Sequence, residues 1–159
     1  MKFKMYLLIL IILTSLLAYF LIFKNQTPTN TIKIDIKNQT YQFEIAKTLA
    51  QKSLGLGNRD SLCQNCGMIF VYQNEGTLPF WMKNTRIPLD IIWLDKNGLV
   101  VDIKTAKPQP NTPDLKLTIY QNPVPAQYVL EINAKEAQKL KLGIGDTIKL
   151  PSQFWWKKS

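Results

Sequence analysis

The sequence contains no histidine, only two cysteines and only seven glycines among 159 residues. Without an imidazole, the chain has no Ser-His-Asp or Cys-His catalytic group, no histidine metal ligand and no histidine general base. Two cysteines are too few for a structural zinc site, which takes four Cys or His ligands. We therefore expect no bound metal and no cofactor, and any chemistry must rest on carboxylates, lysines or thiols.

Negative charge is also scarce, since 20 Lys and Arg face 11 Asp and Glu and give a formal net charge of +9. A basic chain raises the question of nucleic acid as a partner. The lysines are scattered through the chain, without a basic stripe or a nucleic-acid-binding motif. We expect no nucleic-acid partner.

One long apolar stretch, residues 5–23, stands near the start of the chain. A helix of this length crosses a hydrocarbon core of about 30 Å. Lys2 and Lys4 precede it, and the positive-inside bias keeps them in the cytoplasm and sends the following chain out. We expect a transmembrane helix within residues 1–24 that anchors an extracytoplasmic domain, periplasmic or extracellular. The alternative is a cleaved signal segment, which would leave the domain secreted.

Three further parts follow this segment. Residues 25–31 form a polar linker, residues 32–150 form the domain, and residues 151–159 form an aromatic and basic tail. The tail is either a frayed terminus or, because aromatic residues next to lysines suit the bilayer interface, a second membrane contact.

Alternation of apolar and polar residues dominates the domain and predicts short strands. The pattern indicates two hairpins, one over residues 32–45 and one over 91–103, where an Asn-Gly pair separates two β-branched runs. Single strands are expected at 67–72, 78–82, 128–132 and 147–150, and short helices at 48–54, capped by Thr48, and at 134–140. We expect a mainly β (α+β) domain, a compact sandwich or barrel-like sheet with two short helices.

The two cysteines form one motif, Cys63-Gln64-Asn65-Cys66. In an exported domain, two nearby thiols and no others favour a disulfide with a small loop. The alternative is a dithiol pair that exchanges with other proteins, although the strand, Trp and long helix of a thioredoxin context are missing.

The stretch from Trp81 to Asp90 is the most unusual in the chain. Its amide, hydroxyl, ammonium and carboxylate groups beside an aromatic ring are what a pocket for a polar ligand needs. The alternative is that these are core and turn residues, with Phe80 and Met82 pointing inward and Trp81 outward. Glu131, in an apolar strand, is the best partner for Asp90 in an acid/base pair. The ligand-binding candidates are Trp81, Met82, Lys83, Asn84, Thr85, Asp90 and Glu131.

The chain resembles domain-of-unknown-function family 192 in four segments, Gly67–Val71, Phe80–Thr85, Ile87–Ile92 and Tyr128–Ile132, and in the closing motif Leu142–Asp146. The resemblance covers about residues 32–150. It implies a compact, β-rich fold that is commonly exported or periplasmic and has no settled biochemical activity.

Two features depart from the family's pattern. Gly55-Leu56-Gly57 stands where the family usually has Gly-Leu-Met, and the cysteine pair stands where the family has polar loop residues. The disulfide is therefore a local addition rather than a family feature.

Three functions follow from these observations. We expect a membrane-anchored exported domain that binds a small polar ligand or a cell-envelope protein through the Trp81–Asp90 region. One alternative is a hydrolase-like enzyme that uses Asp90 and Glu131. The other is thiol-disulfide exchange through Cys63 and Cys66.

Overall fold

The computed structural model describes Thr14 and residues 30–152. The chain divides into two compact units, Met1–Asn30 and Thr31–Ser159, of which the second holds the β-rich domain. The expected membrane helix at 5–23 and most of the expected tail lie outside the described residues. Among the residues that are described, no helix has the length and apolar character needed to cross a bilayer.

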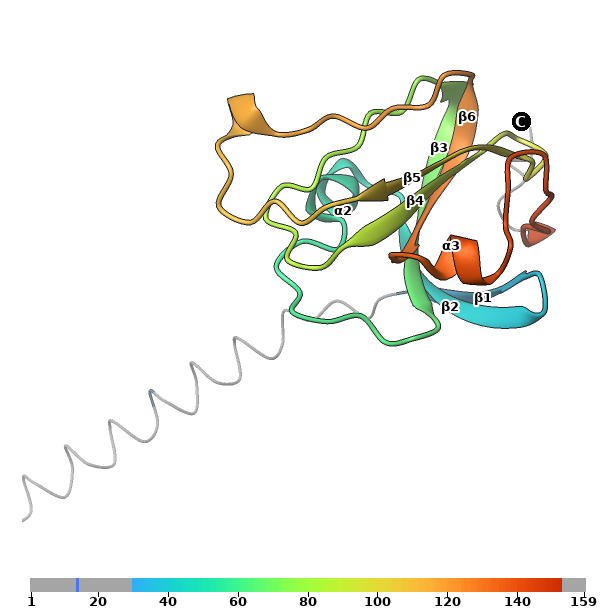
Figure 1. The fold of residues 1–159 in the computed structure, drawn as a ribbon, viewed down its shortest axis with the longest axis horizontal. Helices are drawn as coiled ribbons and strands as arrows, with labels where there is room; N and C mark the ends of the chain where they lie inside the picture. Colours follow the sequence, from blue (N-terminus) through green and yellow to red (C-terminus); the bar gives the residue numbers. More distant parts are fainter. Residues whose placement is uncertain (1–13, 15–29, 153–159) are drawn as a thin grey trace, which may run out of the picture. The chain divides into compact units, whose positions relative to one another are not determined.

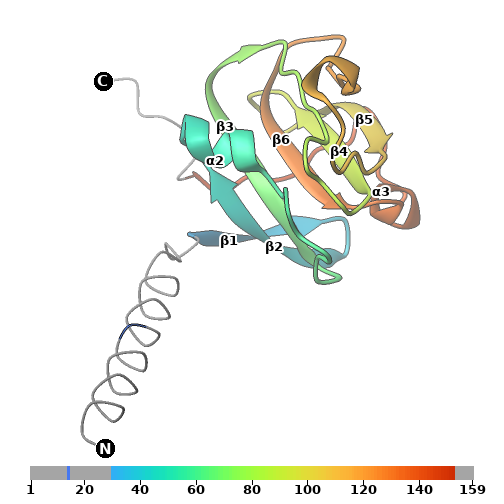
Figure 2. The ribbon, with the colours of Figure 1, turned by 90° about the vertical axis from the view of Figure 1, so that its left-hand side faces the viewer.

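The domain is built on one six-stranded sheet (Figures 1 and 2). Its spatial order is β1-β2-β3-β6-β4-β5, and every neighbouring pair is antiparallel except β2 and β3. The strands are β1 (Thr31–Ile36), β2 (Gln39–Ala46), β3 (Cys66–Gly76), β4 (Leu89–Leu94), β5 (Val100–Ala106) and β6 (Ala126–Asn133). The helices are α2 (Leu49–Leu54), the 3-10 turn η1 (Asp114–Lys116) and α3 (Glu136–Lys139).

The mainly β class and the two short helices were expected, but the sheet is an open mixed sheet rather than a sandwich or closed barrel. Two segments that were expected to be strands, 78–82 and 147–150, do not form strands in the structure. Phe80, within 78–82, makes only an isolated bridge to Tyr120, and Thr147 makes only an isolated bridge to Leu99. Pro79 beside Phe80 has no N–H to donate to a ladder, which limits pairing in that segment.

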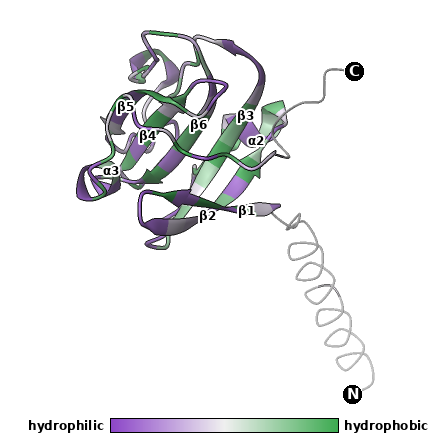
Figure 3. Cartoon of the chain, turned by 90° about the vertical axis from the view of Figure 1, so that its right-hand side faces the viewer, coloured by the Kyte–Doolittle hydropathy of each residue, from purple (hydrophilic) through white to green (hydrophobic). Residues whose placement is uncertain are grey.

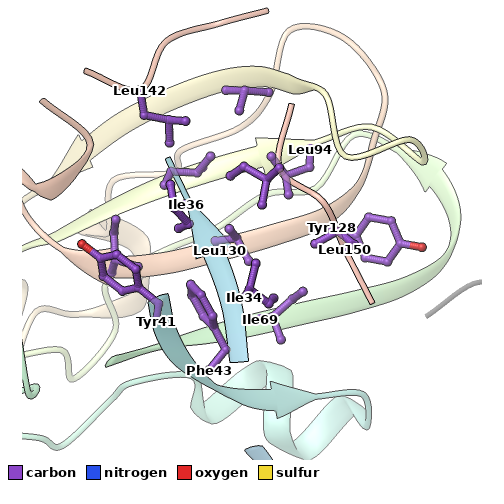
Figure 4. Packing of buried hydrophobic residues seen from close by; sticks show 14 of the residues in the cluster. Ile34, Ile36, Tyr41, Phe43, Ile69, Leu94, Tyr128, Leu130, Leu142 and Leu150 are labelled. Carbon is purple, nitrogen blue, oxygen red and sulfur yellow. The ribbon is translucent and has the colours of Figure 1, made fainter. Parts of the chain in front are cut away.

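Mainly irregular segments cover both faces of the open sheet. One face carries the core of β1, β2 and the even-numbered positions of β4, and it is closed by Leu142, Ile148 and Leu150 from the C-terminal segment. Figure 4 shows side chains from the strands gathered with Leu142 and Leu150. The other face packs Met68, Phe70, Ile91 and Trp93 beneath Leu56, Phe80 and Met82. A sheet buried on both sides needs no closure to protect its core.

Helix α2 connects the parallel pair β2 and β3. Thr48 caps it as expected, because its hydroxyl accepts a hydrogen bond from the Gln51 backbone N–H at 3.2 Å and the Gln51 side chain accepts from the Thr48 backbone N–H. None of the α2 residues is buried. Helix α3 is mostly hydrophilic (Figure 3), but unlike α2 it buries Glu136 and Ala137, and Ala137 belongs to the core on the first face.

Gly67 fixes the close approach of the central strands. It pairs with Phe43 on β2 and with Ile132 on β6. A β-carbon there would lie 2.5 Å from a ring carbon of Phe43 and closer still to the backbone oxygen of Glu131. Only glycine fits between these two neighbours without moving the backbone.

Candidate functional site

A cavity of about 610 Å³ lies between α2, the sheet and the loop before β4. We call it the α2 pocket. Its walls are mainly apolar and come from segments far apart in the sequence, which is the usual character of a small-molecule site. The lining residues are Leu49, Lys52, Ser53, Leu54, Gly55, Leu56, Phe70, Tyr72, Pro79, Phe80, Trp81, Lys83, Thr85, Ile119 and Glu131.

Aromatic rings form much of the pocket wall. The rings of Phe70 and Phe80 meet edge to face with centroids 4.7 Å apart, and Phe80 packs in turn against Trp93 at 6.0 Å. The ammonium of Lys52 lies 3.8 Å from the centre of the Tyr72 ring. Trp81 remains 46% exposed, so the wall continues outward to the mouth of the pocket.

Glu131 supplies the one buried carboxyl group of the lining. It lies on β6 and is only 4% exposed, and its Oε2 has no hydrogen-bond partner among the described residues. A β-carbon built on Gly55 would lie 3.7 Å from this oxygen, so the absence of a side chain at Gly55 keeps the space beside it clear. Burial raises the pKa of Glu131 to about 8, and the nearby Arg59 guanidinium opposes the rise.

Among the described residues, no hydrogen bond joins the Oε2 of Glu131 to Arg59, whose guanidinium is paired elsewhere. Its two terminal nitrogens donate to the two carboxylate oxygens of Glu44, at 2.5 and 2.8 Å. This bidentate pair raises the pKa of Arg59. Arg59 still acts on Glu131 through its charge, which lowers the pKa of Glu131 and only partly offsets the effect of burial.

The loop before β4 places alternate side chains in and out of the core. Phe80 and Met82 are buried, while Trp81 and Lys83 face the solvent side, which is the arrangement that the sequence alternation indicated. Asn84 has a φ of 54° and ends the extended stretch, and the Thr85 N–H donates to the Met82 carbonyl at 3.0 Å. This turn redirects the chain towards β4, and Trp81 lies at the mouth of the pocket.

The structure places the seven candidate residues at four locations. Trp81, Lys83, Thr85 and Glu131 line the α2 pocket. Asn84 borders a neighbouring hollow of about 420 Å³, which it shares with Trp81 and Lys83. Met82 is fully buried in the core. Asp90 is the remaining member, and it lies elsewhere.

Asp90 faces the opposite side of the sheet from Glu131. In the pairing of β4 with β6, Ile91 is opposite Glu131, and Asp90 is opposite Ile132. The Asp90 carboxylate accepts hydrogen bonds from the Thr105 hydroxyl at 2.7 Å and from the Ala137 backbone N–H at 3.0 Å. It holds the start of α3 against the sheet. The two carboxyl groups share no pocket, so the hydrolase hypothesis that paired them is wrong.

Several pocket residues were not expected from the sequence. Lys52, Phe70, Tyr72 and Ile119 belong to segments that the alternation pattern treated as ordinary helix, strand or loop. One signal was present. Leu49 and Leu54 stand at the two ends of the expected helix, and in the structure they are 87% and 60% exposed and line the pocket, as exposed apolar side chains at a binding surface do.

The cysteines lie outside the α2 pocket. Cys63 and Cys66 are joined by a disulfide, with their Cα atoms 5.2 Å apart. The Asn133 side chain donates to the Cys63 carbonyl at 3.0 Å and holds this loop beside the end of β6. Among the described residues, no group of three or more His, Cys, Asp or Glu side chains is placed to hold a metal ion.

The fold and these motifs agree with a known family. The family model described as an uncharacterized ACR, DUF192, matches residues 31–150. The chain belongs to the DUF192 family. A comparison with curated proteins gives no significant match.

Two solved structures resemble this DUF192 chain. One is a "putative transcription regulator" from Sinorhizobium meliloti 1021, with 26% identity, a TM-score of 0.65, and coverage of 75% of this chain and 91% of that one. The other is a protein of unknown function from Novosphingobium aromaticivorans, with 30% identity, a TM-score of 0.64, and coverage of 78% and 90%. Both likenesses support the fold of the DUF192 domain and leave its activity open.

Proposed function

We propose that this DUF192 domain is a binding module that takes a small polar ligand in the α2 pocket. The observation that carries the proposal is the Oε2 of Glu131, which is buried beside an open cavity and has no hydrogen-bond partner among the described residues. A buried polar atom without a hydrogen bond costs about 1–3 kcal/mol. A ligand that fills the cavity and contacts this oxygen recovers that free energy, and the fold itself gains nothing from leaving it unpaired.

The mouth of the pocket supports the same function. Leu49, Leu54, Trp81 and Ile119 are all large apolar residues with about half or more of their surface exposed. They line one cavity instead of being scattered singly. Exposed apolar groups gathered around a concave site, with a few polar groups inside it, are typical of a ligand-binding pocket.

The proposal places this pocket outside the cytoplasm, in a domain anchored by residues 5–23. The apolar stretch with its preceding lysines and the disulfide between Cys63 and Cys66 support that location. The partners would be the membrane, through residues 5–23, and a small ligand or an envelope protein at the pocket. Mass spectrometry of the mature N-terminus tests the anchor, since loss of residues 5–23 would mean that the domain is secreted.

The binding function is tested with three small probes of different charge. These are choline, the uncharged carbon isostere of choline with a tert-butyl group in place of trimethylammonium, and acetate. We expect at least one to bind the full chain saturably at millimolar concentrations and to lose binding in Trp81→Ala. Ile144→Ala is the matched control, because Ile144 is 70% exposed and lines a hollow beside Asp90. No saturable binding by any probe, or equal loss in both variants, would overturn the proposal.

A further inference from the structure

We propose that the α2 pocket selects a small organic cation, an alkylated ammonium group, held by the Glu131 carboxylate and by the aromatic rings of Tyr72, Phe80 and Trp81. This inference rests on the proposed function, because it names the class of ligand that the same pocket takes.

The charges around the pocket leave Glu131 as its unpaired acid. Lys83 contacts Asp114, with Nζ 2.7 Å from Oδ2, and Arg59 is paired with Glu44. A cationic ligand meets this carboxyl group, whose Oε2 has no hydrogen-bond partner among the described residues, and it also meets the Lys52 ammonium, which must move aside. The ionisable groups facing this site from the surrounding elements are Lys52 from α2, Arg59 from the following loop, Glu44 from β2, Tyr72 from β3 and Lys83 from the loop before β4.

The aromatic wall suits the same ligand. Ring faces carry negative electrostatic potential and attract ammonium groups within about 6 Å of the ring centre. Phe70, Tyr72, Phe80 and Trp81 all line the pocket. An apolar wall of this kind also receives the methyl groups of an alkylated ammonium, which a free metal ion does not offer.

Lys52 already makes this type of contact. Its ammonium lies 3.8 Å from the centre of the Tyr72 ring, and burial lowers the pKa of Lys52. The pocket thus holds one cation against an aromatic face, supplied by a flexible side chain from the exposed helix α2. A ligand cation that displaces the Lys52 ammonium replaces its contact with the Tyr72 ring. The ligand also adds a contact with the Glu131 carboxylate.

A neutral hydrogen-bond acceptor is the rival ligand, and pH separates the two. Burial raises the pKa of Glu131 to about 8, so the carboxyl group is mainly protonated at neutral pH and donates to an acceptor in that form. A cation binds the ionised form and releases the proton. Its affinity therefore rises with pH up to about 8, whereas the affinity of a neutral acceptor falls.

The test titrates the full chain with choline and its uncharged tert-butyl isostere, in a maltoside detergent that carries no choline group. Binding is followed by calorimetry and by NMR at about pH 6 and about pH 9, on either side of the Glu131 pKa. At the higher pH we expect choline to bind at least about tenfold more tightly than the isostere. Choline should weaken by about tenfold or more at the lower pH, and the isostere should not.

Two variants assign the preference to the proposed groups. Glu131→Gln should remove the pH dependence and most of the preference for choline, and should keep binding of the isostere. Tyr72→Leu should lower choline affinity without changing that of the isostere. The wild-type comparison alone remains decisive if either variant fails to fold.

The remaining outcomes separate this inference from the proposed function. If the isostere or acetate binds as tightly as choline at both pH values, the cation preference is wrong and the binding function stands. If none of the probes binds, both proposals fail.

Discussion

Asp90 and Glu131 lie on adjacent strands of one sheet but project from its opposite faces. Asp90 is enclosed by donors, with its two oxygens accepting from Thr105 and Ala137. Glu131 has an oxygen that nothing in the described part of the chain contacts by a hydrogen bond. The Asp90 carboxylate thus holds α3 on one face of the sheet, and the Glu131 carboxyl group lines a cavity on the other face.

The first prediction concerns the pH dependence of stability. Burial raises the folded pKa of Glu131 from its ordinary 4.5 to about 8, so between these values the folded state holds a proton that the unfolded state has lost. Stability is therefore highest at low pH within this window and falls as pH rises, by up to about 1.4 kcal/mol for each pH unit. Urea unfolding at a series of pH values measures this slope.

The control for this prediction is Glu131→Gln, which has nearly the same shape and does not titrate. Its unfolding free energy should be nearly flat between pH values of about 5 and 8. The chain has no histidine, so no imidazole titration obscures this window. A wild-type curve as flat as that of the variant would show that Glu131 is ionised in the folded protein and would contradict the account of the pocket.

The second prediction concerns Asp90. In Asp90→Asn, the amide nitrogen cannot accept a hydrogen bond, so either the Thr105 hydroxyl or the Ala137 N–H loses its acceptor. We expect a loss of about 1–3 kcal/mol in the free energy of unfolding. Probe binding, measured below the new melting temperature, should be unchanged. Loss of binding with unchanged stability would instead place Asp90 in a functional site.

The third prediction compares an outward-facing and an inward-facing side chain of the loop before β4. Trp81→Ala should lower the free energy of unfolding by less than about 1 kcal/mol, because Trp81 is 46% exposed. Met82→Ala should cost about 2–5 kcal/mol, because Met82 is fully buried. Chemical denaturation of the two variants measures both values. A large loss for Trp81→Ala would mean that the ring is a core residue and that its effect on binding is indirect.

The fourth prediction concerns the disulfide. Replacing Cys63 and Cys66 together by serine opens a short loop and should cost about 2 kcal/mol by the loop-entropy account. Probe binding should persist, since neither cysteine lines the α2 pocket. The reduction potential tests the thiol-exchange alternative. A value far below about −300 mV indicates a structural bond, and a value well above it would support exchange.

Much of the fold could be predicted because strand alternation is a local signal. The period-two pattern predicted the β1–β2 hairpin, the β4–β5 hairpin and β6, and the Thr48 cap located α2. The openness of the sheet could not be predicted in the same way, since it depends on the segments that cover its two faces. Residues 78–82 show the difference, because their apolar pattern serves to cover the sheet and not to extend it.

The site was predicted only in part, and the reason is register. Alternation tells which residues of one strand share a face, but the pairing of β4 with β6 decides whether Asp90 and Glu131 share one. These strands are not consecutive in the sequence, so no turn fixes their register. Likewise, the lining brings together Lys52, Tyr72 and Ile119, which are joined only by the tertiary fold.

The most direct test of the central claim is an NMR titration of the full chain that follows the Trp81 indole N–H, assigned with Trp81→Phe. Choline at a pH of about 9 should shift this signal saturably, together with signals from α2 and from Glu131, and should leave those around Asp90 unchanged. A titration in which choline, its uncharged isostere and acetate all leave the Trp81 and Glu131 signals unchanged would contradict a ligand site in the α2 pocket.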